Sequence, residues 1–165
     1  MAVYLGIDPG AKGALCFLDI DNRKLAFRPT PCLEFSAAEL RKTVMAVNKT
    51  KDILMIGIED VHAIHGTSAG SNFKFGYNVG AINALMETTG IGIDKITPKS
   101  WQNAVKVPTK KKAGGPTQLK KAIASIALRL YPNAELLGPR GGVIDGRADA
   151  LMIAHYLAIK YGGLK

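Results

Sequence analysis

The sequence predicts an α/β protein built on a mixed five-stranded sheet with helices on both faces. Three short apolar runs near the start, separated by turn residues, predict a three-stranded meander. Helix-like and strand-like segments then alternate along the rest of the chain. Because the chain has 165 residues and no break in composition, we expect one domain over residues 1–165.

The first predicted strand lies in Val3–Gly10, VYLGIDPG, an apolar run that ends in Asp8 and a Pro-Gly turn. Gly13–Ile20 and Leu25–Arg28 predict the second and third strands, with an Asp-Asn turn between them. A carboxylate next to a core is costly unless it is paired, hydrogen-bonded or bound to a metal. We therefore expect Asp8 to have such a partner.

The middle of the chain predicts two helices and a second strand that ends in an acid. A helix is expected to start at Ser36, where Glu39 completes a capping box and apolar residues recur at helical spacing. Ile53–Ile58 is a continuous apolar run, typical of a central strand, and Glu59 follows it directly. Another helix is predicted from about 72 to 88.

The last part of the chain begins with a predicted fifth strand, Gly90–Ile96. A Thr-Pro pair then starts a short helix carrying Trp101, which we expect in the core. Lys106–Lys121 predicts a mobile basic loop running into a helix that ends near Tyr131. A further loop precedes the last predicted helix, Val143–Tyr161.

The charge balance points to a polyanionic partner, because the formal net charge is +9 and the pI is near 9.6. Lysines of the basic segment are expected to contact phosphates without reading base sequence; they are Lys106, Lys110, Lys111, Lys112, Lys120 and Lys121. The alternative is a solvated linker. Charge does not separate DNA from RNA.

The remaining composition indicates an intracellular protein. Cys16 and Cys32 match no metal-ligand spacing, so we expect reduced thiols. No basic-then-apolar leader precedes Asp8, and no apolar run approaches the ~20 residues needed to span a bilayer. We therefore expect no membrane partner.

Two more acids, Asp145 and Asp149, lie four residues apart in the last predicted helix. If that helix includes Asp145, both carboxylates project from one face, where their repulsion favours a bound cation. With Asp8 and Glu59 they would form an all-oxygen ligand set, which suits Mg²⁺ or Mn²⁺. The alternative is that Asp145 is the N-terminal charge of the helix and Asp149 is solvated.

Three of these segments resemble, in order and spacing, the signatures of RuvC-type Holliday junction resolvases: Gly6–Gly10, Ile58–Asp60 and Asp145–Ala154. The match is nearest to the phage and plant chloroplast branch, which also has a Phe-Gly-Tyr segment like Phe75–Tyr77. The resemblance spans essentially the whole chain. It implies the ribonuclease H-like fold, whose layout the order of predicted elements also matches.

The resemblance implies that Asp8, Glu59 and Asp149 bind metal, with Asp145 as a fourth acid. Bacterial members space the last pair as Asp-x-x-Asp, and the position of their first acid is Gly146 here. The implied reaction is phosphodiester hydrolysis with two Mg²⁺ ions (Mn²⁺ possible) per active site, about 3.5–4 Å apart and bridged by Asp8. Paired symmetric nicks in a four-way DNA junction imply a homodimer. The sequence identifies no helicase partner.

The loop after the second acid carries His62 and His65, which the resemblance places near the junction centre as DNA contacts or as ordinary exposed residues. Phe73, Phe75 and Tyr77 are expected to pack in the core or in a dimer, or to stack on unpaired bases. The alternatives to a junction resolvase are an RNA-processing nuclease of the same fold and a non-catalytic module that binds branched nucleic acid. A nucleotide-dependent kinase or ATPase fragment ranks last, because no second Gly-rich phosphate loop is seen.

Overall fold

A computed structural model describes residues 2–10, 12–22, 24–29, 37–62, 66–144 and 146–164. Its strands are β1 (Ala2–Asp8), β2 (Ala14–Asp19), β3 (Lys24–Pro29), β4 (Asp52–Glu59) and β5 (Ile93–Ile96). Its helices are α1 (Ala37–Thr50), α2 (Ala69–Glu87), α3 (Pro98–Ala104), α4 (Lys110–Ala113), α5 (Pro116–Leu130) and α6 (Arg147–Lys160).

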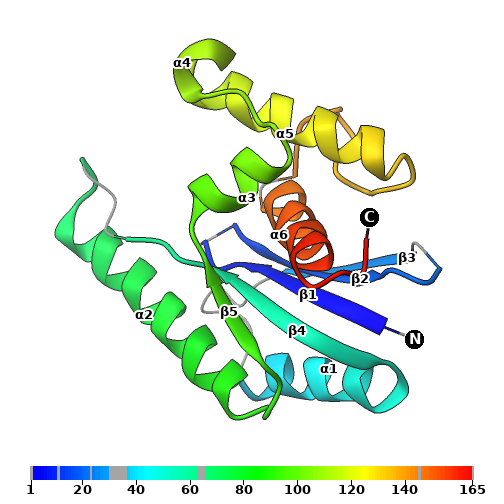
Figure 1. Ribbon diagram of the computed structural model, residues 1–165. Coiled ribbons are helices and arrows are strands. Elements are labelled where there is room, and N and C mark those ends of the chain that lie inside the picture. The colour runs from blue at the N-terminus through cyan, green and yellow to red at the C-terminus, as the bar shows by residue number, and fades with distance from the viewer. Residues whose placement is uncertain are drawn as a thin grey trace.

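The strands form one five-stranded mixed sheet in the order β3-β2-β1-β4-β5 (Figure 1). β1, β2 and β3 pair antiparallel as a meander, whereas β4 and β5 run parallel to β1. This confirms the predicted mixed sheet. Because β1 and β4 are parallel neighbours, their carboxyl ends meet at one edge of the sheet, where ligands commonly bind in α/β folds.

Helices cover both faces of the sheet (Figure 1). One face packs against α6, with α3 and α5 beside it, and this core includes Trp101 and Leu151. The other face packs against α1 and α2, and its core includes Val44, Ile82 and Met86. The apolar run of β4 contributes Ile56 and Ile58 to this second core, as its burial between layers predicts. No helix in the described parts of the chain is both long and apolar enough to cross a membrane.

Two glycines let α6 lie directly on the sheet. Gly6 of β1 and Gly57 of β4 are register partners. A Cβ on Gly6 would meet backbone atoms of α6, including the amide nitrogen of Ala154 at 2.6 Å. A Cβ on Gly57 would lie 2.9 Å from Ile153 Cγ2. Larger residues would therefore push the helix away from the two strands that end in acids.

The last helix begins later than predicted, at Arg147 instead of Val143. Gly146 precedes it with a left-handed φ of 76°, a conformation that an α-helix does not contain. Val143 instead forms an isolated antiparallel bridge with Leu137. The predicted range 143–161 is therefore wrong at its start.

The basic segment 106–121 is not one loop. Thr109 accepts a hydrogen bond from the Lys112 amide at 3.4 Å and caps α4, and Gly114 ends that helix with a left-handed φ of 89°. Pro116 then opens α5, a position that suits proline because the first turn leaves its amides unpaired. The prediction of a loop overlooked these three signals: the N-cap Thr109, the helix-ending Gly114 and the helix-starting Pro116.

Candidate active site

Asp8 and Glu59 are brought together by strand pairing. Parallel pairing of Ile7 with Ile58 places the next residues, Asp8 and Glu59, side by side at the carboxyl ends of β1 and β4. The Gly10 amide donates to Asp8 Oδ1 at 2.9 Å, so the Pro-Gly turn holds this carboxylate as it leaves the strand. Both side chains are only partly exposed.

Asp149 joins them from the first turn of α6. The close approach of α6 to Gly6 occurs at Ala150, the next residue, so Asp149 is held at the same edge of the sheet. A carboxylate in a first helical turn is stabilised by the unpaired amides there. Three distant segments of the chain therefore supply acids to one place.

The electrostatics of Glu59 show that these acids interact. The pKa of Glu59 is raised to about 7, mainly by burial and also by the neighbouring charges of Asp8 and Asp149, against an opposing hydrogen bond from Trp101. The indole Nε1 of Trp101 donates to Glu59 Oε1 at 2.9 Å. Glu59 is thus a crowded acid that a nearby cation would favour in its charged form.

This donor set suits a hard divalent cation, because all three groups are carboxylates and the charges of Asp8 and Asp149 raise the cost of ionising Glu59. Across the ranges that the structure describes, no three His, Cys, Asp or Glu side chains are already arranged around a common metal position. The three acids therefore form an electrostatically coupled group, and their side chains would have to converge on an ion.

The fourth predicted acid, Asp145, lies outside the described residues. Because α6 starts at Arg147, the argument that Asp145 and Asp149 share a helix face does not hold. The neighbouring position 146 cannot carry an acid. A Cβ there would lie 2.5 Å from Gly13 Cα and 2.6 Å from the Lys12 carbonyl oxygen, and φ is left-handed. Contact with the β1–β2 turn therefore leaves no room at position 146 for the acid that an Asp-x-x-Asp spacing would place there.

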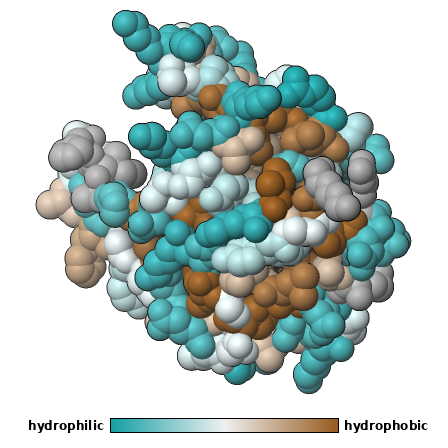
Figure 2. All heavy atoms as spheres, in the orientation of Figure 1, coloured by the Kyte–Doolittle hydropathy of each residue, from teal (hydrophilic) through white to brown (hydrophobic). Residues whose placement is uncertain are grey.

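The residues predicted to contact nucleic acid lie on the surface wherever the structure describes them. His62 is exposed three residues beyond Glu59, and His65 lies outside the described residues. All six predicted lysines are exposed: Lys106 follows α3, Lys110, Lys111 and Lys112 lie on α4, and Lys120 and Lys121 lie on α5. Figure 2 shows the surface indented between the upper lobe, which carries α4, and the N-terminal part of α2 at the left.

The aromatic residues of α2 are not in the core of this chain. Phe73 is 75% exposed and Tyr77 is 63% exposed, whereas α2 packs on the sheet through Ile82 and Met86. Phe75 is partly buried. Core packing is therefore wrong for Phe73 and Tyr77, and the other two interpretations remain for this face.

Trp101 was expected only as a core residue, and it is indeed 1% exposed, but it also touches a candidate site acid. The sequence carried one signal for this contact: Trp101 lies three residues after the Thr-Pro pair that follows β5, the strand next to β4. A second signal is the repeated Gly-Ile-acid pattern, Gly6 to Asp8 and Gly57 to Glu59, which marks the strands that α6 approaches closely.

No protein family matches the sequence, and no curated protein sequence matches it. Solved structures do match. RuvC of Thermus thermophilus in complex with Holliday junction substrate has a TM-score of 0.60 and 18% identity, covering 98% of this chain and 97% of that one. Another Thermus thermophilus RuvC structure has a TM-score of 0.61 and 19% identity, covering 97% and 96%.

The yeast mitochondrial Holliday junction resolvase Ydc2 also matches, with a TM-score of 0.50 and 18% identity over 93% of this chain and 76% of that one. Similarity at this level of identity concerns the fold. The nearer resemblance to the phage and plant chloroplast branch stays a prediction. The chain therefore has the ribonuclease H-like fold found in the RuvC Holliday junction resolvases.

Proposed function

We propose that this protein is a metal-dependent endonuclease that resolves four-way DNA junctions by paired, symmetric nicks. The observation that carries this proposal is the meeting of Asp8, Glu59 and Asp149 at one edge of the sheet, in a fold shared with RuvC resolvases. A module that only binds nucleic acid has no use for carboxylates that repel its phosphates.

Asp8, Glu59 and Asp149 would hold the metal, with Asp145 as a fourth ligand or as a group that supports one. Two bound divalent ions would supply an activated water and stabilise the leaving oxygen of the phosphodiester. The chain's own contribution is to hold the acids in place: Gly10 holds Asp8, and α6 carries Asp149.

The lysines of α4, α5 and the segment before α4 would bind the phosphates of the junction arms. They are all exposed, and α4 lies at the start of α5, away from the sheet (Figure 1). These contacts would add affinity that falls with salt, without selecting a base sequence. One of these lysines near the cleaved phosphate would also stabilise the charge that develops there.

We infer that the protein acts as a homodimer that packs through the outer face of α2. Phe73 and Tyr77 are both exposed on this helix, and Gly76 and Gly80 leave open space beside them. Small residues next to exposed aromatic rings let a second helix approach closely. A two-fold dimer would present two equivalent active sites, as symmetric cutting of opposite strands requires.

The test compares a labelled four-way junction with a linear duplex of the same sequence, in Mg²⁺ and in EDTA. We expect paired nicks in the junction only, abolished by EDTA and by Asp8→Asn. Asp52→Asn is the matched control, because Asp52 is an exposed acid at the opposite end of β4. This variant should cut the junction normally. Cutting of RNA alone would change the substrate class, and binding without cutting in both Mg²⁺ and Mn²⁺ would indicate a binding module.

A further inference from the structure

The hydrogen bond between Trp101 and Glu59 links the core directly to the candidate metal site. The indole Nε1 donates to Glu59 Oε1 at 2.9 Å, across 42 positions of sequence. An indole offers one N–H, so it holds one carboxylate oxygen and leaves Oε2 for a cation. The hydrogen bond therefore influences the orientation of the Glu59 carboxylate towards the candidate metal site.

The local fold brings these two side chains together. Glu59 ends β4 opposite Ile96, the last residue of β5. Thr97 then caps α3 by accepting a hydrogen bond from the Ser100 amide at 3.3 Å, with Pro98 in the first turn. Trp101 consequently lies one helical turn from the strand end that pairs with Glu59.

Burial fixes the indole in this position. Trp101 is 1% exposed and belongs to the core formed with α5 and α6. A large side chain in a close-packed core has no other rotamer available without displacing its neighbours. Its N–H direction is therefore set by the fold and not by solvent, as a donor that orients a ligand requires.

We propose that Trp101 is a positioning residue that orients the Glu59 carboxylate for divalent-metal binding, and that its indole reports on the occupancy of the site. This inference rests on the proposed function, since it concerns the same acids. Partners that orient metal ligands typically change metal affinity by about 10–100-fold when they are removed. Trp101 is also the single tryptophan of the chain, so its emission can be followed alone.

The first experiment uses the unmodified protein. Trp101 emission is followed while Mg²⁺ is added in the absence of DNA, and then EDTA is added. We expect a saturable change that EDTA reverses, because a cation at Glu59 withdraws charge from the oxygen that accepts the indole N–H. In Asp8→Asn the same change should require at least tenfold more Mg²⁺. An emission that stays constant over the Mg²⁺ range in which junction cleavage saturates would overturn the proposal.

The second experiment compares Trp101→Phe with Tyr131→Phe. Tyr131 is a matched control because it is 8% exposed, lies in the same core and loses a hydroxyl that forms a 2.8 Å hydrogen bond with His155, away from Glu59. We expect Trp101→Phe to raise the Mg²⁺ concentration for half-maximal cleavage on the order of tenfold, with a maximal rate within a few-fold of normal. Tyr131→Phe should leave that concentration unchanged. Equal effects of the two variants would mean that the bond only satisfies a buried donor.

These outcomes separate this inference from the proposed function. A Mg²⁺-dependent Trp101 signal in a protein that cuts no junction would support the positioning role and refute the resolvase. Junction cleavage with a constant Trp101 signal, and with an unchanged Mg²⁺ requirement in Trp101→Phe, would support the resolvase and refute the positioning role. If Trp101→Phe does not fold, the titration of the unmodified protein still decides, since it needs no substitution.

Discussion

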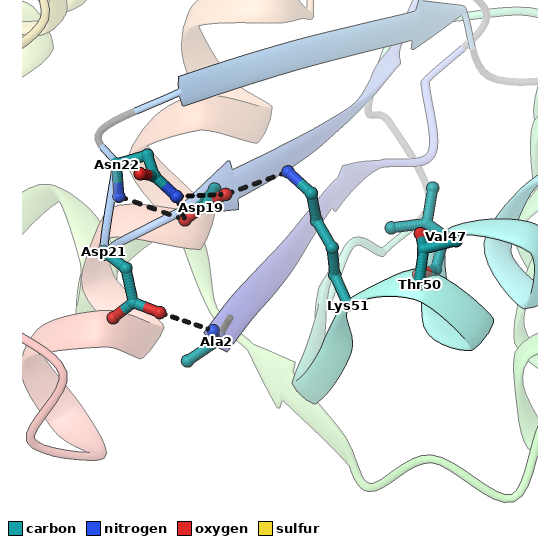
Figure 3. Close-up of polar contacts among 7 residues, drawn as sticks. All are labelled: Ala2, Asp19, Asp21, Asn22, Val47, Thr50 and Lys51. Carbon is teal, nitrogen blue, oxygen red and sulfur yellow. Dashed lines mark hydrogen bonds and ion pairs between the residues drawn. The ribbon is translucent and has the colours of Figure 1, made fainter.

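The Asp19 carboxylate accepts a charged hydrogen bond from Lys51, with 2.8 Å between Oδ2 and Nζ (Figure 3). Asp19 ends β2 and pairs with Val3 at the start of β1, so this ion pair lies at the opposite end of β1 from Asp8. Asn22 also donates to Asp19 through its backbone amide at 3.1 Å. This buried acid thus pairs with a cation within the fold, whereas at the other end of β1 the charges of Asp8 and Asp149 act against the ionisation of Glu59.

Replacing Asp19 with Asn should destabilise the protein at neutral pH. Burial alone raises the pKa of Asp19, but hydrogen bonds from Lys51 and Asn22 outweigh it and hold the pKa at about 2. Because the pKa in the folded state is below the ordinary carboxyl value of 3.8, the stability that this group contributes is present above pH 4 and is lost as the pH falls towards 2. We expect Asp19→Asn to cost about 2 kcal/mol at pH 7 and much less at pH 2.

Urea unfolding at the two pH values measures this difference. Asp21→Asn is the control, since Asp21 is exposed and accepts a hydrogen bond from the Ala2 amide at 3.0 Å (Figure 3). It should cost well under 1 kcal/mol. An equal loss in both variants at pH 7 would mean that the Lys51 pair adds nothing.

Glu59→Gln should stabilise the metal-free protein at high pH. The pKa of Glu59 is raised to about 7, mainly by burial, so the folded state holds its proton more tightly than the unfolded state. Stability from this group is therefore full below about pH 4.5 and falls as the pH rises through 7. In EDTA at pH 8 the variant should be more stable by up to about 3 kcal/mol, with no gain at pH 4.

The same unfolding curves repeated with Mg²⁺ add a control. A bound ion should stabilise the unmodified protein by mass action and should stabilise Glu59→Gln less. If the variant shows the same pH dependence as the unmodified protein in EDTA, then Glu59 does not titrate as described.

Gly6→Ala should destabilise the protein strongly, because its Cβ would overlap the backbone of α6 near Ala150 and Ala154. Backbone atoms cannot rotate away as a flexible side chain can, so α6 must shift from β1. Overpacking of this kind typically costs about 1–3 kcal/mol. Gly70→Ala is the control: Gly70 lies in α2 with open space around its Cβ, and alanine there should be neutral or slightly stabilising. Thermal unfolding of both variants gives the comparison.

The fold was largely predictable because its signals are local and repeated. Apolar runs ending in Asp8 and Glu59 located two central strands, and short turns located the meander. The start of α6 was misplaced because Gly146 is read in sequence as one small residue in a helical pattern. Its left-handed φ and its close approach to Gly13, which is distant in the chain, become visible only in the folded structure.

The site was predictable only in part, for the same reason. That Asp8, Glu59 and Asp149 meet depends on strand ends and on one helix, which periodicity locates. The hydrogen bond from Trp101 to Glu59 forms because β4 and β5 are neighbours in the sheet. The sequence alone does not reveal which strands are neighbours. The buried indole therefore looked like an ordinary core residue.

Removing charge from α4 should weaken junction binding in a salt-dependent way. Lys110 and Lys111 are exposed on this short helix, so their double alanine variant removes two of the proposed phosphate contacts without touching the core. We expect the slope of log Kd against log salt to fall by about 2 and the affinity to drop alike for all junction sequences. The control is the double alanine variant of Lys42 and Lys49, both exposed on α1 across the sheet. Equal losses of junction affinity in the two double variants would indicate that binding depends on the overall charge of the protein and not on the position of α4.

Tyr77→Ser should weaken the dimer and leave the chain folded. Tyr77 is 63% exposed and lies on the α2 face beside Gly76 and Gly80, so its ring contributes little to the core of one chain. If two copies pack there, losing the ring removes buried apolar surface from both sides of a two-fold interface. Analytical ultracentrifugation should show dissociation at concentrations where the unmodified protein is dimeric, and junction cleavage should shift from paired nicks to single ones. Ile159→Ser, at a 43% exposed site on α6, is the control and should leave both readouts unchanged. A Tyr77→Ser protein that stays dimeric while Ile159→Ser dissociates would move the interface to the other side of the sheet.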